Sequence, residues 1–383
     1  MRILVTSVVD LKKSQHNRSF QFIKHLSNHH DVTVVTINDW WKGSQDDLHQ
    51  YSKSFEEVFN RIDFRTLTDK RISPLLQEIL PSRTMREVLK LDFDVHFDYN
   101  TISSGYKASK LLPTVYDFAD DLAAMIRYSP QVPRFLRPLA GGYGGFMIRR
   151  NLKKAKRITL ATQVLMNSID IGKEKCTVVP NGVDTHLFKK SEDSKRILGF
   201  NEFVIGYVGV LREWVDFRPV FTALQEIQED IKLVIVGKEG NFEENKKLAT
   251  EMGVRKRVSF IGMVPYGEIP KYISAMDLCL IPFTKDKISQ HSLPLKLFEY
   301  MACEKPVIST ELLGVKNEVG DRIRYANNAK EFKDQILDLY HDDQLRQKMG
   351  EDGRRFVEMN YEWARIAEKM EGILKDIVLE GNG

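Results

Sequence analysis

The segment from His291 to Thr310 reads HSLPLKLFEYMACEKPVIST and combines a loop, a helix and a strand. Its apolar pattern predicts a short helix over residues 297–302 and a buried strand over 306–310. Within the helical turn, Glu299 follows Lys296 by three residues, so the two side chains share a helix face. The pair forms either a surface ion pair or a ligand site at a helix N-terminus. Such a terminus attracts phosphate, and a carboxylate beside it accepts hydrogen bonds from sugar hydroxyls.

Short apolar runs alternate with helical patterns along the rest of the chain. This alternation is typical of parallel sheets covered by helices on both faces, so it predicts an α/β fold with doubly wound domains. The predicted strands of the first half lie at 3–8, 32–36, 62–67, 95–99, 114–118, 158–161 and 177–179. Those of the second half lie at 204–210, 233–236, 258–261, 278–281 and 307–309.

Glycines mark the ends of three predicted strands in the second half, at Gly209, Gly237 and Gly262. Glycine lets a ligand approach the backbone closely. Ligands of such folds bind beyond the carboxyl ends of the strands. The sequence therefore predicts a binding site at this edge of the second sheet, together with the segment that holds Glu299.

Length and composition indicate a soluble protein with two domains. The 383 residues exceed what one hydrophobic core usually supports. Hydrophobic residues make up 42% of the chain, charged residues make up 29%, and the net charge is +4. No run of about 20 apolar residues is present, and the start MRILVTSVVDLKK predicts a buried strand instead of a signal peptide. The three cysteines lack metal-ligand spacing and fit a reducing cytoplasm.

Three carboxylates follow the predicted strand at 114–118 in the sequence VYDFADDL: Asp117, Asp120 and Asp121. One interpretation is that Asp117 or Asp120 caps the next helix, because Asp is a preferred N-cap residue. The other is that one of the three is a general base whose pKa its neighbours raise. A metal site is disfavoured, because no histidine lies nearby in the sequence.

Residues 122–169 contain no acidic residue. Their nine cations are Arg127, Arg134, Arg137, Arg149, Arg150, Lys153, Lys154, Lys156 and Arg157. Apolar residues such as Phe135, Leu136 and Phe146 lie among them. This basic window is either a solvated helix face or a surface that docks on anionic lipid headgroups. Nucleic acid is not expected as a partner, because no aromatic stacking platform accompanies the charge.

Two motifs carry a family resemblance that covers nearly the whole chain. The string VVPNGVDTHLF at 178–188 resembles the interdomain crossing of GT-B glycosyltransferases, and EYMACEKPVI resembles the nucleotide-sugar segment of their family 4. The resemblance implies two Rossmann-like domains that face a cleft. We expect an acceptor-binding domain at 1–185 and a donor-binding domain at 186–359. The apolar stripe of the C-terminal helix, 360–380, predicts an amphipathic helix that, as in the family, crosses back to the first domain.

The resemblance implies transfer of a sugar from a nucleotide-diphosphate donor. In the family the carboxylate at Glu299 holds the ribose, and backbone groups at Met263 and Val264 read the base. The phosphates would bind at the N-terminus of the helix over 295–302, which needs no metal or other cofactor. The expected donor residues also include Gly209, Arg212, Lys238, His291, Ser292, Leu295 and Lys296. The loop at 10–18 is either solvated or contacts the acceptor, and in the second case the acceptor residues are His16 and Arg18.

The chain departs from the family pattern at three positions. His291 replaces the first of two glutamates, and Val210 and Val215 replace the Arg and Lys of the usual phosphate clamp. Two alternatives therefore stay open: a nucleotide-sugar epimerase on the same fold, and a non-catalytic partner subunit.

A second, narrower resemblance indicates where in the cell the protein acts. Trp214 and Asp216, together with the motif at 292–300, resemble a subgroup linked to cell-surface polysaccharide assembly. With the basic window, this predicts a cytoplasmic enzyme on the inner face of the membrane, with a lipid-linked or glycan acceptor.

Overall fold

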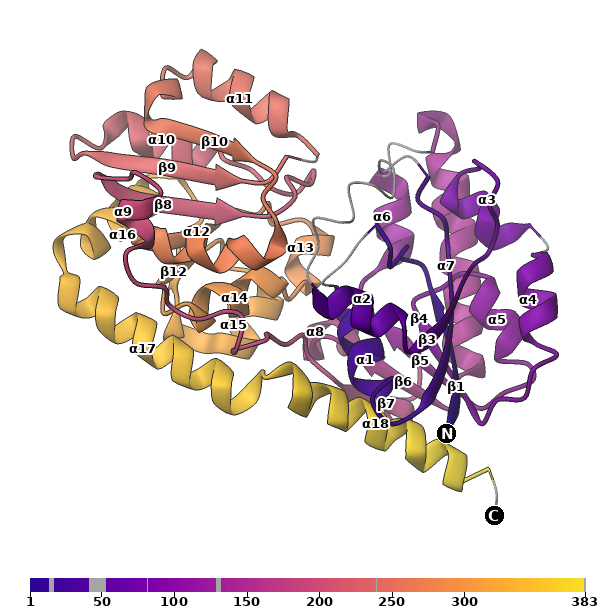
Figure 1. The fold of residues 1–383 in the computed structure, drawn as a ribbon. Coiled ribbons are helices and arrows are strands. Elements are labelled where there is room, and N and C mark those ends of the chain that lie inside the picture. The colour runs from indigo at the N-terminus through magenta and orange to yellow at the C-terminus, as the bar shows by residue number, and fades with distance from the viewer. Residues whose placement is uncertain (14–16, 41–52, 81, 129–131, 239, 382–383) are drawn as a thin grey trace. The chain divides into compact units, whose positions relative to one another are not determined.

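The computed structural model describes residues 1–13, 17–40, 53–80, 82–128, 132–238 and 240–381. The predicted acceptor residue His16 lies outside them. The chain divides into two compact units. Unit 1 comprises Met1–Pro180 and Ala364–Gly383, and unit 2 comprises Asn181–Trp363 (Figure 1).

Unit 1 is built on a seven-stranded sheet in the order β3-β2-β1-β4-β5-β6-β7. All neighbouring strands pair in parallel. The strands are β1 Arg2–Ser7, β2 Asp31–Thr36, β3 Ile62–Thr66, β4 Val95–Tyr99, β5 Thr114–Phe118, β6 Arg157–Leu160 and β7 Cys176–Val178. The inner strands β1, β2, β4, β5 and β6 are buried along almost their whole length, as expected for strands covered on both faces, whereas the edge strands β3 and β7 are only partly buried.

The helices of unit 1 follow from local capping signals. Asn17 caps α1 by accepting from the Phe20 N–H, and Thr162 caps α8 in the same way. The helices are α1 Arg18–Leu26, α2 Lys53–Phe59, α3 Pro74–Ile79, α4 Arg83–Val88, α5 Ser104–Ala108, α6 Leu122–Tyr128, α7 Arg137–Lys154 and α8 Gln163–Ser168. The 3₁₀ turns η2, Arg134–Leu136, and η3, Lys173–Lys175, precede α7 and β7.

The last helix, α18 (Trp363–Leu379), belongs to unit 1 for almost its whole length. Of the predicted stripe it buries Trp363, Ile366, Met370 and Ile377, whereas Leu374 is buried in place of the predicted Ile373. Glu371 accepts hydrogen bonds from two histidines of unit 1, and the Lys369 ammonium donates to the Val178 carbonyl. The predicted return of this helix to the first domain is therefore confirmed.

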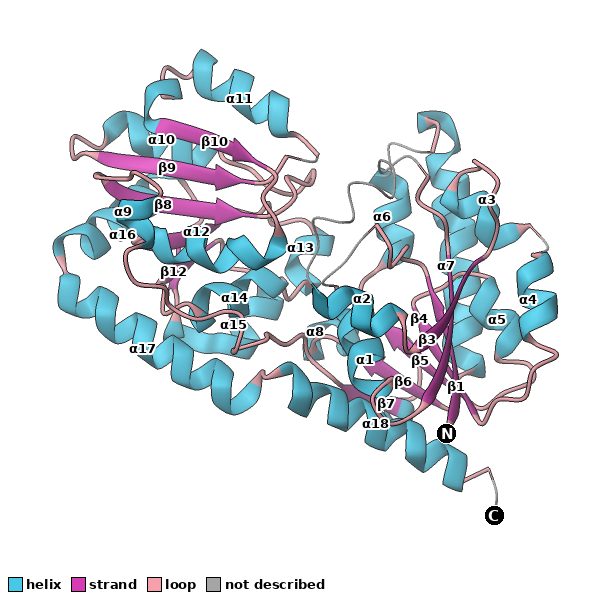
Figure 2. Ribbon diagram, in the orientation of Figure 1, coloured by secondary structure: helices cyan, strands magenta, loops and turns pink. Residues whose placement is uncertain are grey.

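Unit 2 contains a six-stranded parallel sheet in the order β10-β9-β8-β11-β12-β13 (Figure 2). Its strands are β8 Phe203–Val208, β9 Ile231–Val236, β10 Val258–Gly262, β11 Leu278–Ile281, β12 Val307–Ser309 and β13 Arg324–Tyr325. Its helices are α9 Ser194–Ile197, α10 Arg218–Glu226, α11 Phe242–Glu251, α12 Ile269–Ala275, α13 Lys287–His291, α14 Leu295–Ala302, α15 Leu313–Val319, α16 Ala329–His341 and α17 Asp343–Asn360. The 3₁₀ turns are η4 Arg255–Arg257, η5 Tyr266–Glu268 and η6 Gly320–Arg322. The two sheets confirm the predicted α/β fold.

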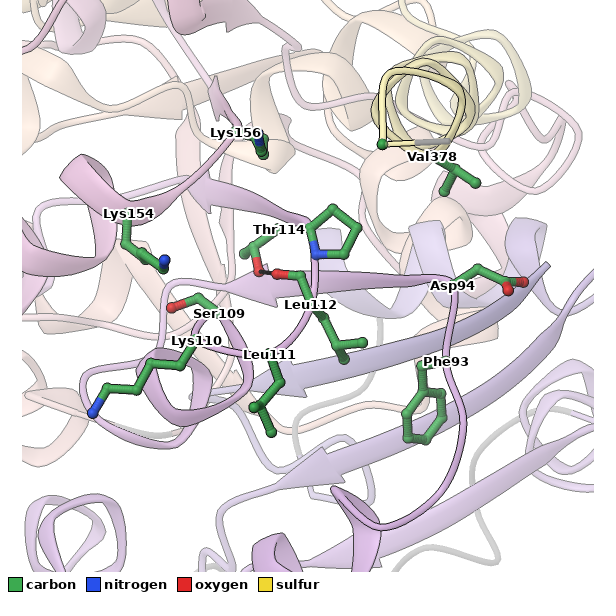
Figure 3. A pocket seen from close by; sticks show the side chains of 12 residues that line it. Phe93, Asp94, Ser109, Lys110, Leu111, Leu112, Thr114, Lys154, Lys156 and Val378 are labelled. Atoms are coloured by element: carbon green, nitrogen blue, oxygen red, sulfur yellow. Dashed lines mark hydrogen bonds between the residues drawn. The ribbon is translucent and has the colours of Figure 1, made fainter. Parts of the chain in front are cut away.

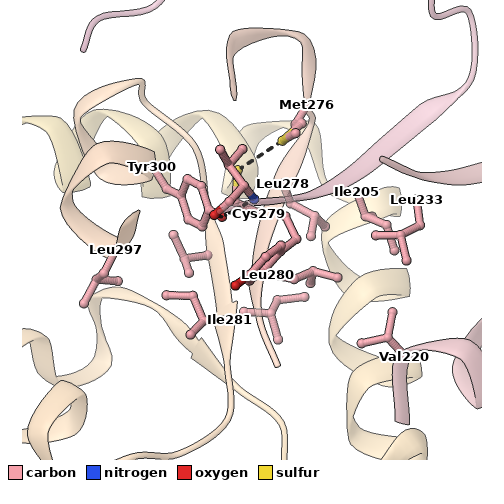
Figure 4. Packing of buried hydrophobic residues seen from close by; sticks show 14 of the residues in the cluster. Ile205, Val220, Leu233, Met276, Leu278, Cys279, Leu280, Ile281, Leu297 and Tyr300 are labelled. Carbon is pink, nitrogen blue, oxygen red and sulfur yellow. Dashed lines mark hydrogen bonds between the residues drawn. The ribbon is translucent and has the colours of Figure 1, made fainter. Parts of the chain in front are cut away.

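The core of unit 2 holds α14 against the sheet. Every residue of β11 is fully buried, and Leu297 and Tyr300 of α14 are part of the same cluster (Figure 4). The Tyr300 hydroxyl accepts a hydrogen bond from the Val208 N–H at 2.7 Å. Because Val208 ends β8, this bond sets the position of α14 relative to the carboxyl end of that strand.

Two segments of unit 2 that adjoin the unit boundary run side by side. The Val183 N–H donates to the Tyr361 carbonyl at 2.7 Å, and the Trp363 N–H donates to the Val183 carbonyl at 3.1 Å. A Cβ at Gly182 would lie 2.8 Å from the Tyr361 carbonyl oxygen, so this close approach requires glycine. The predicted domain limit at residue 185 lies a few residues beyond the point at which the two units divide.

Candidate functional site

The three predicted glycines meet at the carboxyl edge of the sheet of unit 2. Gly209, Gly237 and Gly262 have φ values of 131°, 138° and 86°, which favour glycine. A Cβ at Gly237 would lie 2.2 Å from the Gly209 carbonyl oxygen, and the Gly237 N–H donates to the Gly262 carbonyl. The ends of these strands therefore pack main chain against main chain, so backbone groups lie at this edge of the sheet.

Lys296, the second residue of α14, reaches this edge. Its ammonium lies 3.9 Å from the centre of the Tyr207 ring and 2.5 Å from the Tyr207 hydroxyl. A Cβ at Gly209 would lie only 2.6 Å from the same ammonium, so glycine makes room for it. The positive end of the helix dipole is unfavourable for a lysine in the first turn. An anion bound there would be attracted by the lysine and by the dipole.

Glu299 lies one turn further along α14 and contacts a different tyrosine. The Tyr266 hydroxyl donates to Glu299 Oε1 at 3.3 Å. Tyr266 belongs to the loop that follows β10 and also contains Met263, which is exposed, and Val264, which packs on the core. Lys296 and Glu299 form no ion pair with one another, so the interpretation as a surface ion pair is wrong.

Burial shifts the pKa values of both ionisable groups of α14, Lys296 and Glu299, toward 7. Removal from water lowers the pKa of Lys296 to about 7, against the attraction of Glu299, and nearby Arg212 adds to this lowering. Burial likewise raises the pKa of Glu299 to about 7, against the effect of Lys296 and of the Tyr266 hydroxyl. Each group is thus poised to change charge when a ligand binds.

The remaining predicted donor residues lie around the same segment. Leu295 begins α14, His291 ends α13, and the Ser292 hydroxyl donates to the Ser289 carbonyl at 2.9 Å. Arg212 and Lys238 are exposed in the loops that follow β8 and β9. Their roles in binding stay predictions.

In unit 1, Asp117 is fully buried at the end of β5 and is bound by Arg18. The Arg18 guanidinium donates to Asp117 Oδ2 from Nε at 2.8 Å and to Oδ1 from Nη2 at 2.9 Å. It also donates to the Pro180 carbonyl at 2.7 Å, and the Thr159 hydroxyl donates to Asp117 at 2.7 Å. Arg18, predicted to touch an acceptor, is only 3% exposed and is the counter-ion of this carboxylate.

The other two aspartates have separate environments. Asp121 Oδ1 accepts from the Ala124 N–H at 3.0 Å and so caps the first turn of α6. The Asp120 side chain reaches solvent, and its backbone carbonyl accepts from the Asn100 side chain at 2.9 Å. The dense protein around Asp120 raises the pKa of its carboxyl by desolvation, and both neighbouring aspartates add to the effect while Arg18 opposes it.

A cavity of 480 Å³ lies at the opposite edge of the same sheet (Figure 3). It is lined by Thr114, the first residue of β5, and by Lys110, Lys154 and Lys156. Because Asp117 is at the other end of β5, this cavity is not part of the aspartate cluster.

Comparisons with known proteins place unit 2 in a family. Residues 190–356 match the family described as Glycosyl transferases group 1. This segment is a group 1 glycosyltransferase domain. The match confirms the predicted enzyme class at the level of the domain, whereas the narrower likeness to family 4 stays a prediction.

Similar proteins match different shares of this chain. A Bacillus subtilis protein, TuaH, whose name provisionally assigns it to teichuronic acid biosynthesis as a glycosyltransferase, is 28% identical over 63% of this chain. The matched part spans 60% of that relative's length. An uncharacterized glycosyltransferase of Methanocaldococcus jannaschii, MJ1069, is 21% identical over 94% of this chain and 93% of its own.

Solved structures agree with the fold over the full chain. HepE from Anabaena, crystallised with UDP and glucose, has a TM-score of 0.77 at 18% identity and covers 98% of this chain and 99% of its own. Sucrose-phosphate synthase from Thermosynechococcus elongatus has a TM-score of 0.78 at 16% identity, with 99% of both chains covered. With the two parallel sheets, these likenesses confirm the predicted GT-B fold.

Sequence reasoning missed the two tyrosines that hold the charged residues of the glycosyltransferase domain. Tyr207 stands two residues before Gly209, and Tyr266 stands two residues after Val264. Those positions beside a predicted strand end and a predicted base-reading loop were the available signal. Within the described part of the chain, no group of three or more His, Cys, Asp or Glu side chains could hold a metal ion. In the same residues, no helix has the length and apolar character needed to cross a bilayer.

Proposed function

We propose that the protein transfers a sugar from a nucleotide-diphosphate donor, bound by unit 2, to an acceptor bound by unit 1. The observation that carries this proposal is the arrangement of α14. It presents an ammonium and a carboxylate, each beside a tyrosine, at the carboxyl edge of the sheet, where Gly209 leaves room for the ammonium.

The donor would be bound by chemically distinct parts of this edge. The diphosphate would lie at the N-terminus of α14, close to Lys296, with Arg212 and Lys238 as further cations. Glu299 would accept hydrogen bonds from the ribose hydroxyls, and backbone groups at Met263 and Val264 would contact the base. Helix dipole and cations would stabilise the leaving diphosphate, so we propose that no metal is required. HepE, a structure of similar fold, binds UDP, which makes a uridine nucleotide the first choice.

On unit 1, Asp120 is the proposed general base for the acceptor hydroxyl. Its carboxyl is accessible and its pKa is raised, whereas Asp117 is bound by Arg18 and Asp121 caps α6. A raised pKa brings a carboxylate closer to the pH at which it removes a proton efficiently.

Nucleotide binding tests the donor site directly. We expect UDP to raise the unfolding temperature more than GDP or ADP, because a ligand of the folded state stabilises it by mass action. The UDP-sugar that binds best should also be hydrolysed slowly by the isolated protein. Binding without hydrolysis or transfer would instead support a non-catalytic partner subunit. If no nucleoside diphosphate shifts the transition, the proposed donor site is wrong.

We further propose that the acceptor is lipid-linked and that unit 1 docks on the inner, cytoplasmic face of an anionic membrane. Phe135, Leu139 and Phe146, of η2 and α7, are 79%, 72% and 58% exposed. The exposed cations Arg134 and Arg149 belong to the same segment. Apolar side chains surrounded by cations suit an anionic bilayer surface, because each cation contributes about 1 kcal/mol there.

Vesicle binding tests this docking. We expect the protein to co-sediment with anionic vesicles and not with neutral ones, and to be released at about 0.5 M salt. The triple change Arg134→Ser, Arg149→Ser and Lys153→Ser should abolish binding. It spares Arg137 and Arg150, which are hydrogen-bonded to the Val132 carbonyl and the Tyr106 hydroxyl.

The matched control removes three exposed cations of unit 2 instead, by Lys189→Ser, Lys256→Ser and Lys330→Ser. It has the same net charge and should bind vesicles like wild type. Equal loss in both triple variants would show that net charge alone matters. If wild-type protein ignores anionic vesicles at low salt, a soluble acceptor is favoured.

A further inference from the structure

Two tyrosines separate the charged groups of α14. Lys296 and Glu299 are three residues apart on one helix, a spacing at which opposite charges commonly pair. In this structure they form no ion pair. Each contacts a tyrosine hydroxyl from another element, Tyr207 in β8 and Tyr266 in η5.

Tyr207 is held in a position in which its hydroxyl accepts a hydrogen bond from Lys296. Its ring is fully buried and packs edge-on against Phe217 with centroids 5.4 Å apart. Its hydroxyl donates to the Val210 carbonyl at 2.9 Å. Since an ammonium can only donate, the oxygen of Tyr207 must be the acceptor for Lys296. The ring face adds a cation–π attraction, and the Phe283 ring lies 5.5 Å from the same ammonium.

Tyr266 has the complementary role. Its ring packs edge-on against Phe188 with centroids 5.5 Å apart, and its hydroxyl donates to the Glu299 carboxylate. Only Pro265 separates it from Val264, in the loop proposed to contact the base. Tyr266 therefore connects the proposed base contact to the proposed ribose contact.

We infer that Tyr207 and Tyr266 are positioning residues that hold Lys296 and Glu299 apart in the proposed donor site. The ammonium is then aimed at a diphosphate and the carboxylate at ribose hydroxyls. This inference rests on the proposed function. An ion pair between the two would have to be broken by each incoming donor, whereas separated groups are ready to bind without that rearrangement.

Three probes distinguish the two roles: UDP, uridine and inorganic pyrophosphate, each titrated calorimetrically. Tyr207→Phe should weaken UDP and pyrophosphate about tenfold and leave uridine unchanged, because only the phosphate contact is affected. Tyr266→Phe should weaken UDP and uridine by a similar factor and leave pyrophosphate unchanged. Tyr325→Phe is the matched control, since its hydroxyl donates to the Gly320 carbonyl in the same unit. All three probes should bind this control like wild type.

A second measurement needs no ligand. Acetic anhydride acylates Lys296 only when its amine is neutral. The extent of acylation, measured by mass spectrometry at a series of pH values, therefore gives the pH midpoint at which Lys296 loses its proton. Loss of the accepting hydroxyl in Tyr207→Phe should move the midpoint to lower pH. Tyr266→Phe keeps both other charged groups near Lys296, namely Glu299 and Arg212, and should change the midpoint less.

The outcomes separate this inference from the function on which it rests. If wild type binds UDP and both tyrosine variants bind all three probes equally well, the inference is wrong and the donor site stands. If wild type binds no nucleotide, the proposed function is wrong. The pH profile of acylation then tests the inference about Tyr207 by itself. An unchanged midpoint in folded Tyr207→Phe would then overturn the inference as well.

Discussion

Asp120→Asn is expected to lower sugar transfer by about a hundredfold or more while UDP binding stays intact. The amide cannot accept the proton of the acceptor hydroxyl, and the donor residues lie in the other unit. Because a base must be ionised and desolvation by the surrounding protein raises the pKa of Asp120, wild-type turnover should fall as the pH is lowered through this raised pKa. The rate of transfer and a UDP titration of the same preparation measure both parts.

The neighbouring aspartates provide the controls. Asp121→Asn should transfer sugar almost normally, since asparagine also caps a helix. Asp117→Asn should destabilise unit 1 by about 3–5 kcal/mol, because it leaves the buried Arg18 guanidinium without a full counter-charge. Near-normal turnover in folded Asp120→Asn would remove this residue from the chemistry.

Glu299→Ala is expected to weaken UDP binding by about 1.5–3 kcal/mol, roughly tenfold to 150-fold. That is the loss typical of hydrogen bonds to a charged group. Isothermal titration with UDP gives the affinity. Glu318→Ala is the matched control, because Glu318 also accepts a hydrogen bond from a tyrosine, Tyr361, in the same unit. UDP should bind this control as tightly as wild type.

The same substitution should not cost stability. Burial raises the folded-state pKa of Glu299 from 4.5 to about 7. The folded state therefore resists ionisation of this group, and the resulting cost is absent below pH 4.5 and complete above about pH 7. Removal of the carboxyl should raise the unfolding temperature slightly at pH 8 and hardly at pH 4. A folded variant with unchanged UDP affinity would exclude Glu299 from the site.

Patterns of neighbouring residues in the sequence predicted the strands and helices whose formation depends mainly on nearby residues. Except for the two-residue strand β13, which was not predicted, strand positions followed from apolar runs, and the helix at 295–302 followed from its period and from the residues around it. The capping interpretation was wrong in its residue. It placed the cap at Asp117 or Asp120, whereas Asp121 caps α6, because an N-cap directly precedes the helix and bonds to its first turn.

Contacts between distant parts of the chain could not be predicted in this way. Arg18 and Asp117 are 99 residues apart, and Lys296 and Tyr207 are 89 apart. No spacing rule connects such residues, so Arg18 was interpreted as a loop residue near an acceptor. In the basic window, composition could not tell that Met147 and Ile148 are buried while Phe135 and Phe146 are exposed.

The order of the two units along the chain constrains how the protein can fold during synthesis. Unit 2 is one continuous segment, Asn181–Trp363, whereas the last helical part of unit 1, Ala364–Gly383, comes after it. The residues of unit 2 are therefore all synthesised before unit 1 acquires the contacts of Glu371 in α18 with His25 and His30. The unit whose synthesis begins first is completed last, and its nascent sheet keeps an uncovered apolar surface until α18 has been made.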